Sequence, residues 1–240
     1  YETLMARTAD GTLVPGLAAA EPTKVDDTTW EFKLREGISF TNGEPFNADA
    51  VVASVQRILN PDLKSEQLAY FGGITGAEKV DDLTVHIKTA GPDPILPSRM
   101  YWMKMVPPQY SSDPKFGELP AGTGPYKLEA FNRGQDIVLV ANPDYWGGAP
   151  DIDKVTYRFV GESGTRLSGL VAGEFDVITN LLPEFVESVP KSATVQGLET
   201  SLIVLSTDNE VTKDPRVREA MNIAIDRQAL ADSLYSGFAL

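Results

Sequence analysis

Few residues in this 240-residue sequence have the types and spacing that covalent catalysis requires. The only histidine, His86, would have to serve as the base of any Ser-His-Asp triad. It falls in a run of alternating apolar and polar residues, so we expect it on the polar face of a hairpin. Ser112 and Lys115 have the Ser-x-x-Lys spacing of penicillin-interacting enzymes, but Pro114 between them disfavours the helix that this motif needs.

Two pairs of carboxylates, Asp151 with Asp153 and Glu174 with Asp176, have the residue types of a glycosidase site. The first pair follows Pro150 and the second lies in a Gly-Glu-Phe-Asp turn, where carboxylates normally accept hydrogen bonds from nearby backbone N–H groups. Their oxygen ligands are too sparse for a hard-cation site. Cysteine is absent, which excludes thiolate nucleophiles, disulfides and cysteine-bound metals in this sequence. We therefore predict no catalytic residue, no metal site and no cofactor.

Two short segments favour binding without reaction. The stretch Arg99-Met100-Tyr101-Trp102-Met103 combines aromatic, thioether and cationic side chains, which suits the wall of an adaptable cleft, although core packing explains it equally well. Gly122-Thr123-Gly124-Pro125 has the glycines of an anion-binding backbone nest. It lacks the later glycines, or the Lys-Ser/Thr pair, of nucleotide-binding loops. We favour a rigid crossover between two structural units for this segment.

The composition indicates an acidic globular protein. Its 21 basic and 34 acidic residues give a formal net charge of −13 at pH 7, which argues against nucleic acid or anionic lipid as the main partner. With 42% hydrophobic and 23% charged residues it resembles an ordinary globular chain of one or two domains. No apolar run approaches the roughly 18 to 20 residues of a membrane helix. Because the sequence starts at Tyr1 without a basic and apolar leader, we expect either a removed targeting segment or excision from a longer chain.

Hydrophobic periodicity predicts the elements that position these segments. Residues 21–90 predict a strand at 28–34, a helix capped by Asn47, and a hairpin that turns at Asp81-Asp82. A short helix is predicted around 96–103. Further along, strands are predicted at 126–128, 137–141, 155–159, 175–178 and 202–205, and helices at 165–172, after Asp214, and from Asp226 to Gly237. The pattern predicts a compact α+β unit followed by an α/β sheet layer.

A series of short motifs extends along nearly the whole chain: Tyr1-Glu2-Thr3-Leu4, Pro15-Gly16-Leu17-Ala18, residues 30–40, Asn42-Gly43-Glu44-Pro45-Phe46, residues 48–51, Gly122-Thr123-Gly124-Pro125-Tyr126, Asn142-Pro143-Asp144-Tyr145-Trp146, Gly173-Glu174-Phe175-Asp176, residues 214–220 and residues 224–227. In this order and spacing they resemble the N-terminal half of the bacterial extracellular solute-binding proteins of family 5. That family is the dipeptide-, oligopeptide- and nickel-binding group of ABC importers.

The resemblance implies an α/β fold with a lobe of the periplasmic binding protein type II, in which helices flank a mixed sheet. Residues 1–20 and 121–240 would form this first lobe, and residues 21–120 a smaller α+β domain beside it. Family members are longer, and their second lobe follows the equivalent of Leu240. We therefore expect a fragment that lacks the second lobe, folds, and binds ligand poorly by itself.

The function implied by the resemblance is capture of a solute by closure of two lobes, followed by delivery to the permease subunits of an ABC importer. The expected protein is a monomer, periplasmic or lipid-anchored on the outer face of the cytoplasmic membrane, with peptides as ligands. Nickel chelates, opines and oligosaccharides are alternative ligands for the same fold. A sensory receptor, and a hydrolase that uses the carboxylate pairs, are alternative functions.

Candidate ligand-binding positions follow from the matched motifs and from the aromatic stretch. Glu2 belongs to the opening motif, near the ligand path of relatives, while Gly124 and Arg133 flank the crossover. Ser206 stands where the family strand usually ends in Asn, so facing the cleft it would change a hydrogen-bond partner of the ligand. The complete set of candidates is Glu2, Arg99, Tyr101, Trp102, Gly124, Arg133 and Ser206.

Overall fold

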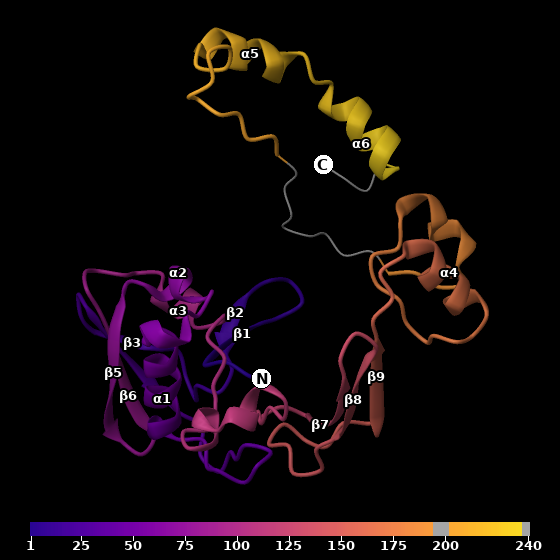
Figure 1. The fold of residues 1–240 in the computed structure, drawn as a ribbon. Helices are drawn as coiled ribbons and strands as arrows, with labels where there is room; N and C mark the ends of the chain where they lie inside the picture. Colours follow the sequence, from indigo (N-terminus) through magenta and orange to yellow (C-terminus); the bar gives the residue numbers. More distant parts are fainter. Residues whose placement is uncertain (194–201, 237–240) are drawn as a thin grey trace. The chain divides into compact units, whose positions relative to one another are not determined.

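The computed structural model describes residues 1–193 and 202–236. The chain divides into two units, Tyr1–Phe159 and Val160–Leu240 (Figure 1). Every strand pairing in the described residues is antiparallel. The chain is therefore a mixed α/β protein, as predicted, but the mixed sheet predicted for the lobe does not form within these residues.

The first unit is built on a four-stranded sheet with the order β3-β4-β6-β5. Phe32 pairs with Val85 and Trp30 pairs with Ile87 across the two central strands, which places these apolar side chains on one face. The strands are β3 (Thr23–Asp26), β4 (Thr29–Lys33), β5 (Ile74–Asp81) and β6 (Thr84–Thr89). The alternation in the sequence thus correctly predicted the central strand and the hairpin.

Helix α1 (Ala48–Leu59) packs against this sheet and closes the core (Figure 1). Its N-cap is Asn47, whose Oδ1 accepts hydrogen bonds from the backbone N–H groups of Asp49 and Ala50 at 3.0 and 3.3 Å. Val51 and Val55 are fully buried on its inner face. The helical spacing and the capping residue predicted from sequence are therefore both confirmed.

The substitution Asn47→Ala is expected to lower the free energy of unfolding by about 1 kcal/mol, because two N–H groups at the start of α1 lose their acceptor. Urea unfolding followed by circular dichroism measures the change. Asn47→Ser is the matched control, since serine caps helices almost as well as asparagine. An alanine variant as stable as the parent, or a serine variant as weak as alanine, would contradict this role.

The N-terminal strands contribute to the same hydrophobic core as the four-stranded sheet. The strands β1 (Met5–Arg7) and β2 (Leu13–Pro15) form a two-stranded ribbon. Met5, Met100 and Met103 are fully buried in the cluster that also contains the sheet residues. Two short helices lie in this unit, α2 (Leu68–Phe71) and α3 (Leu96–Arg99). The predicted helix around 96–103 is thus shorter than expected, because α3 ends at Arg99 and residues 100–102 form a turn.

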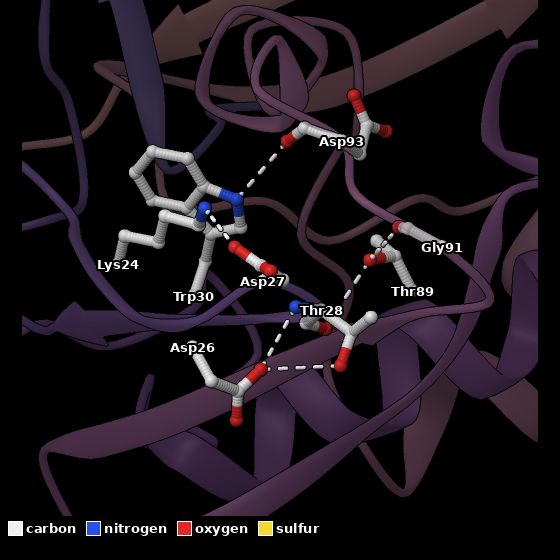
Figure 2. Close-up of polar contacts among 8 residues, drawn as sticks. All are labelled: Lys24, Asp26, Asp27, Thr28, Trp30, Thr89, Gly91 and Asp93. Carbon is white, nitrogen blue, oxygen red and sulfur yellow. Dashed lines mark hydrogen bonds and ion pairs between the residues drawn. The ribbon is translucent and has the colours of Figure 1, made fainter.

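Hydrogen bonds fix the β3–β4 turn and attach the segment before α3 to the sheet (Figure 2). The Asp26 carboxylate accepts a hydrogen bond from the backbone N–H of Thr28 at 2.8 Å, and Lys24 pairs with Asp27 at 2.6 Å. The indole N–H of Trp30 donates to the carbonyl of Asp93 at 3.0 Å. This long-range contact helps to position the chain that continues into residues 99–104.

A second sheet completes the first unit, with β8 (Asp136–Ala141) between β7 (Tyr126–Asn132) and β9 (Lys154–Arg158). All three strands were predicted from apolar runs and alternation, and the structure confirms them. None of their residues is fully buried.

The second unit contains the helices α4 (Ser163–Val171), α5 (Pro215–Ile223) and α6 (Arg227–Tyr235). Asp214 and Asp226 cap the last two helices, as predicted. The predicted strands at 175–178 and 202–205 are wrong, because these residues are irregular. A strand needs a hydrogen-bonded neighbour, and the described part of this unit holds none; Ile203, for example, is 74% exposed. The predicted end of the last helix at Gly237 lies outside the described residues.

Among the described helices, none has the length and apolar character that crossing a bilayer requires.

Candidate functional site

The carboxylate of Glu2 accepts hydrogen bonds from three side chains that are distant in the sequence. The hydroxyl of Thr123 donates at 2.7 Å, the phenol of Tyr145 at 2.8 Å and the indole N–H of Trp146 at 2.9 Å. We call these four residues the Glu2 cluster. It joins the opening motif to the glycine motif and to the Asn-Pro-Asp-Tyr-Trp motif.

Backbone contacts hold the Glu2 cluster in place. The N–H of Met105 donates to the carbonyl of Glu2 at 3.0 Å, and the N–H of Thr41 donates to the carbonyl of Gly122 at 2.8 Å. The buried side chain of Asn142 donates to the carbonyl of Gly124 at 3.2 Å. Gly124, a predicted ligand-binding residue, therefore contributes a backbone acceptor that anchors the Asn-Pro-Asp-Tyr-Trp turn.

Burial, the hydrogen bond to Glu2 and the charge of Glu2 together raise the pKa of Tyr145 to about 12. The phenol therefore keeps its proton at neutral pH and acts as a donor. Because the folded-state pKa lies above the ordinary value of 10, this group's stabilisation is complete below pH 10 and is lost as the pH rises toward 12.

In the variant Glu2→Gln, we expect the pKa of Tyr145 to fall toward 10, because an amide lacks the charge that disfavours the phenolate. Alkaline titration followed by the phenolate absorbance measures this pKa. The variant Tyr145→Phe identifies which part of the titration curve comes from Tyr145 among the 8 tyrosines. An unchanged Tyr145 titration in Glu2→Gln would show that burial alone sets the pKa.

Tyr101 and Trp102 form a second group on the same unit. Their ring centroids are 4.9 Å apart in an edge-to-face arrangement, and Trp102 is 58% exposed. The guanidinium carbon of Arg7 lies 5.4 Å from the Tyr101 ring centroid, and Nζ of Lys104 lies 5.9 Å from it. We call these four residues the Tyr101 cluster. An exposed indole supported by a tyrosine and two cations is a surface on which a planar or charged solute can stack.

Burial alternates along residues 102–105, just after the turn at residues 100–102. Met103 and Met105 point into the core, whereas Trp102 and Lys104 are exposed. Lys104 pairs with Thr3 in an isolated antiparallel bridge, so the segment runs beside the N-terminal residues that include Glu2. Met100 and Met103 thus pack in the core, whereas Trp102 is exposed. A role of the aromatic residues in the wall of a cleft stays a prediction.

Arg99 and Arg133, two further predicted positions, contact carboxylates elsewhere in the first unit. Arg99 forms an ion pair with Asp93 at 3.3 Å, and Nη1 also donates to the carbonyl of Tyr70 at 3.4 Å. Arg133 lies in the exposed connection between β7 and β8, 3.6 Å from Glu118.

Ser206 belongs to the second unit, where its hydroxyl oxygen accepts a hydrogen bond from the N–H of Asp208 at 3.3 Å. The structure thus brings Tyr101 and Trp102 together and places Glu2 beside the segment that follows them, through the hydrogen bond from Met105. Roles in ligand binding for all seven predicted positions stay predictions.

Sequence reasoning did not single out Arg7 and Lys104, or the three donors to Glu2. Tyr145 and Trp146 were visible only as a family motif, and nothing local indicated that they contact Glu2. The exposure of Lys104 could have been predicted, because this residue lies between Met103 and Met105, which are both buried. The position of Arg7 could not, since its place above Tyr101 depends on the tertiary fold.

His86, Ser112 and Lys115, which were considered for catalysis, lie on three different elements of the first unit. His86 pairs with Glu31 across β4 and β6, on the polar face as predicted, with Nε2 3.0 Å from the carboxylate. The hydrogen bond from His86 is the main cause that lowers the pKa of Glu31. Ser112 and Lys115 lie on two separate 3-10 helices, Tyr110–Ser112 and Pro114–Gly117. Within the described ranges, no three His, Cys, Asp or Glu side chains gather as metal ligands would.

The chain is similar in sequence to known solute-binding proteins. Residues 12–240 match the sequence model described as bacterial extracellular solute-binding proteins, family 5 Middle. The Nickel-binding periplasmic protein of Escherichia coli K12 is 29% identical over 254 residues, which cover 99% of this chain and 48% of that protein. The Glutathione-binding protein GsiB of Salmonella typhi is 31% identical over 226 residues, covering 89% of this chain and 44% of that protein. The chain spans about half the length of the curated relatives it matches.

Two solved structures of binding proteins have a similar fold over nearly all of this chain. NikA from Brucella suis in complex with Fe(III)-EDTA superimposes with a TM-score of 0.85 at 28% identity, over 99% of this chain and 51% of that one. The oligopeptide-binding protein AppA from Bacillus subtilis, in complex with a nonapeptide, has a TM-score of 0.80 at 25% identity, over 99% and 50% of the two chains.

Proposed function

The chain belongs to the bacterial extracellular solute-binding proteins, family 5, a family of non-enzymatic binding proteins of ABC transporters, and from this we propose that it captures a short peptide for import. The observation that carries the proposal is the exposed Trp102, which packs on Tyr101 beside the N-terminal segment that contains Glu2. Such a surface binds a solute by contact and offers no group that would react with it.

The fold supports this role because both clusters rest on one packed core. Met103 and Met105 anchor the segment of Trp102, and the N–H of Met105 ties that segment to Glu2. Side chains held in this way are ordered before a ligand arrives, which reduces the conformational entropy that binding must overcome.

Uptake would proceed by binding and closure, with no bond made or broken. In this proposal residues 1–20 and 121–240 belong to a first lobe, residues 21–120 to the small domain beside it, and the ligand is held against a second lobe. A ligand that contacts both lobes stabilises the closed state by the difference between its affinities for the closed and open states. The closed form would then deliver its cargo to a membrane permease from the periplasm or from a lipid anchor outside the cytoplasmic membrane.

Short peptides are the ligand class that we favour. DppA from Helicobacter pylori, in complex with the peptide STSA, has a TM-score of 0.79 at 25% identity, and the nonapeptide complex of AppA supports the same class. Glutathione, the named ligand of another relative, is itself a tripeptide. Nickel, the named ligand of a further relative, makes a nickel chelate the second candidate.

Equilibrium dialysis of protein expressed from the complete gene tests this function. The probes are an equimolar library of tripeptides, glutathione and the nickel complex of histidine, each counted by mass spectrometry. We expect retention of tripeptides at micromolar concentration, and retention of the nickel complex alone would favour the second candidate. Loss of parent peptide with the appearance of cleavage products, or no retention of any probe, would refute the proposal.

A further inference from the structure

The Tyr101 cluster contains two cations that have no carboxylate partner in the described part of the chain. The ion pairs found there include neither Arg7 nor Lys104. Both side chains are exposed, and both lie beside the ring of Tyr101. The hydrogen bond that Arg7 donates to the carbonyl of Gly11, at 2.8 Å, holds its guanidinium in this place.

Two cations beside one ring concentrate positive charge in an otherwise acidic protein. The sequence has 34 acidic against 21 basic residues, and some other cations have carboxylate partners, as Lys79 has in Asp49 and Asp82. Two cations near one ring repel each other, and the field that they produce attracts an anion. Glu2, next to Thr3 that pairs with Lys104, uses its carboxylate oxygens to accept the three hydrogen bonds of the Glu2 cluster.

Resting on the function proposed above, we propose that Arg7 and Lys104 bind a carboxylate of the solute while its body packs on Trp102. For a short peptide this group is the C-terminal carboxylate. Arg7 uses one of its five N–H donors on Gly11, so others remain to hold an oxyanion, and the ammonium of Lys104 is a second donor. The two cations select solutes that carry a negative charge, and the exposed indole supplies contact area without charge preference.

Two tripeptide libraries that lack Asp and Glu test this inference in protein expressed from the complete gene. One library has free C-terminal carboxyl groups and the other is amidated, so the two differ only in that charge. We expect equilibrium dialysis to show the acid library bound at least tenfold more tightly. Arg7→Gln and Lys104→Gln should each weaken acid binding roughly tenfold, as for loss of one charge-assisted contact, and weaken amide binding much less, so that the acid preference falls.

Two control variants separate charge at the site from other effects. Lys24→Gln removes the same charge from the exposed strand β3 and should leave the acid preference unchanged. Lys104→Arg keeps the charge and should keep the preference. Equal binding of acid and amide libraries would overturn this inference and leave solute capture intact, whereas binding of neither library would overturn both. Equal weakening of both libraries by Arg7→Gln or Lys104→Gln would show a packing role and would also overturn it.

Discussion

Replacing Phe32 with alanine is expected to lower the free energy of unfolding by about 3–5 kcal/mol, because the benzyl group of a core residue is removed and a cavity remains. Phe32 is 0% exposed and lies at the centre of β4, opposite Val85 on β6. A loss of this size is a large share of the roughly 5–15 kcal/mol by which a domain is stable. Urea unfolding of the 240-residue chain, followed by circular dichroism, measures it.

The matched control is Phe131→Ala, which removes the same side chain from β7, where it is 41% exposed. We expect that change to cost under about 1 kcal/mol. If Phe32→Ala prevents folding altogether, Phe32→Leu gives a measurable case, with an expected loss near 1 kcal/mol. Equal losses for the alanine variants at positions 32 and 131 would show that the four-stranded sheet does not hold the principal core.

Replacing Trp102 with alanine is expected to weaken tripeptide binding about 30-fold while leaving stability nearly unchanged. Removal of a large aromatic anchor from the centre of a binding surface typically costs about 2 kcal/mol of binding free energy. Its exposure of 58% means that little core packing is lost with it. Equilibrium dialysis against the tripeptide library, together with the thermal unfolding midpoint, separates the two effects.

Two further variants sharpen this result. Trp102→Phe keeps an aromatic face and should keep most of the affinity. Tyr157→Ala removes an aromatic side chain of similar exposure from β9, 59% against 58%, and should leave binding unchanged. Binding by Trp102→Ala equal to the parent would mean that the Tyr101 cluster is not the solute surface.

The elements of the first unit could be predicted from sequence because their signals are local. Asn47 caps α1 through its own side chain, and the alternation around His86 follows directly from a sheet with one buried face. The apolar runs at 175–178 and 202–205 were wrongly predicted as strands, because a local signal carries no information about a partner strand. Hydrophobicity predicts that a run can be a strand, but only a partner strand makes it one.

The site was predicted only in part, since its geometry depends on contacts across long stretches of chain. Tyr101 and Trp102 were recognisable as an aromatic pair beside a cation. The cations that lie beside Tyr101 are Arg7 and Lys104, whereas Arg99 turns away to Asp93. No spacing rule relates residue 7 to residue 101, so sequence periodicity could not have paired them.

Native mass spectrometry of the protein, expressed from its complete gene and mixed with the tripeptide library, tests the central claim most directly. We predict a single peptide bound per protein, released on denaturation with its mass unchanged. Bare protein at every library concentration, or bound species whose masses match cleaved peptides, would contradict the conclusion that these residues hold a solute without transforming it.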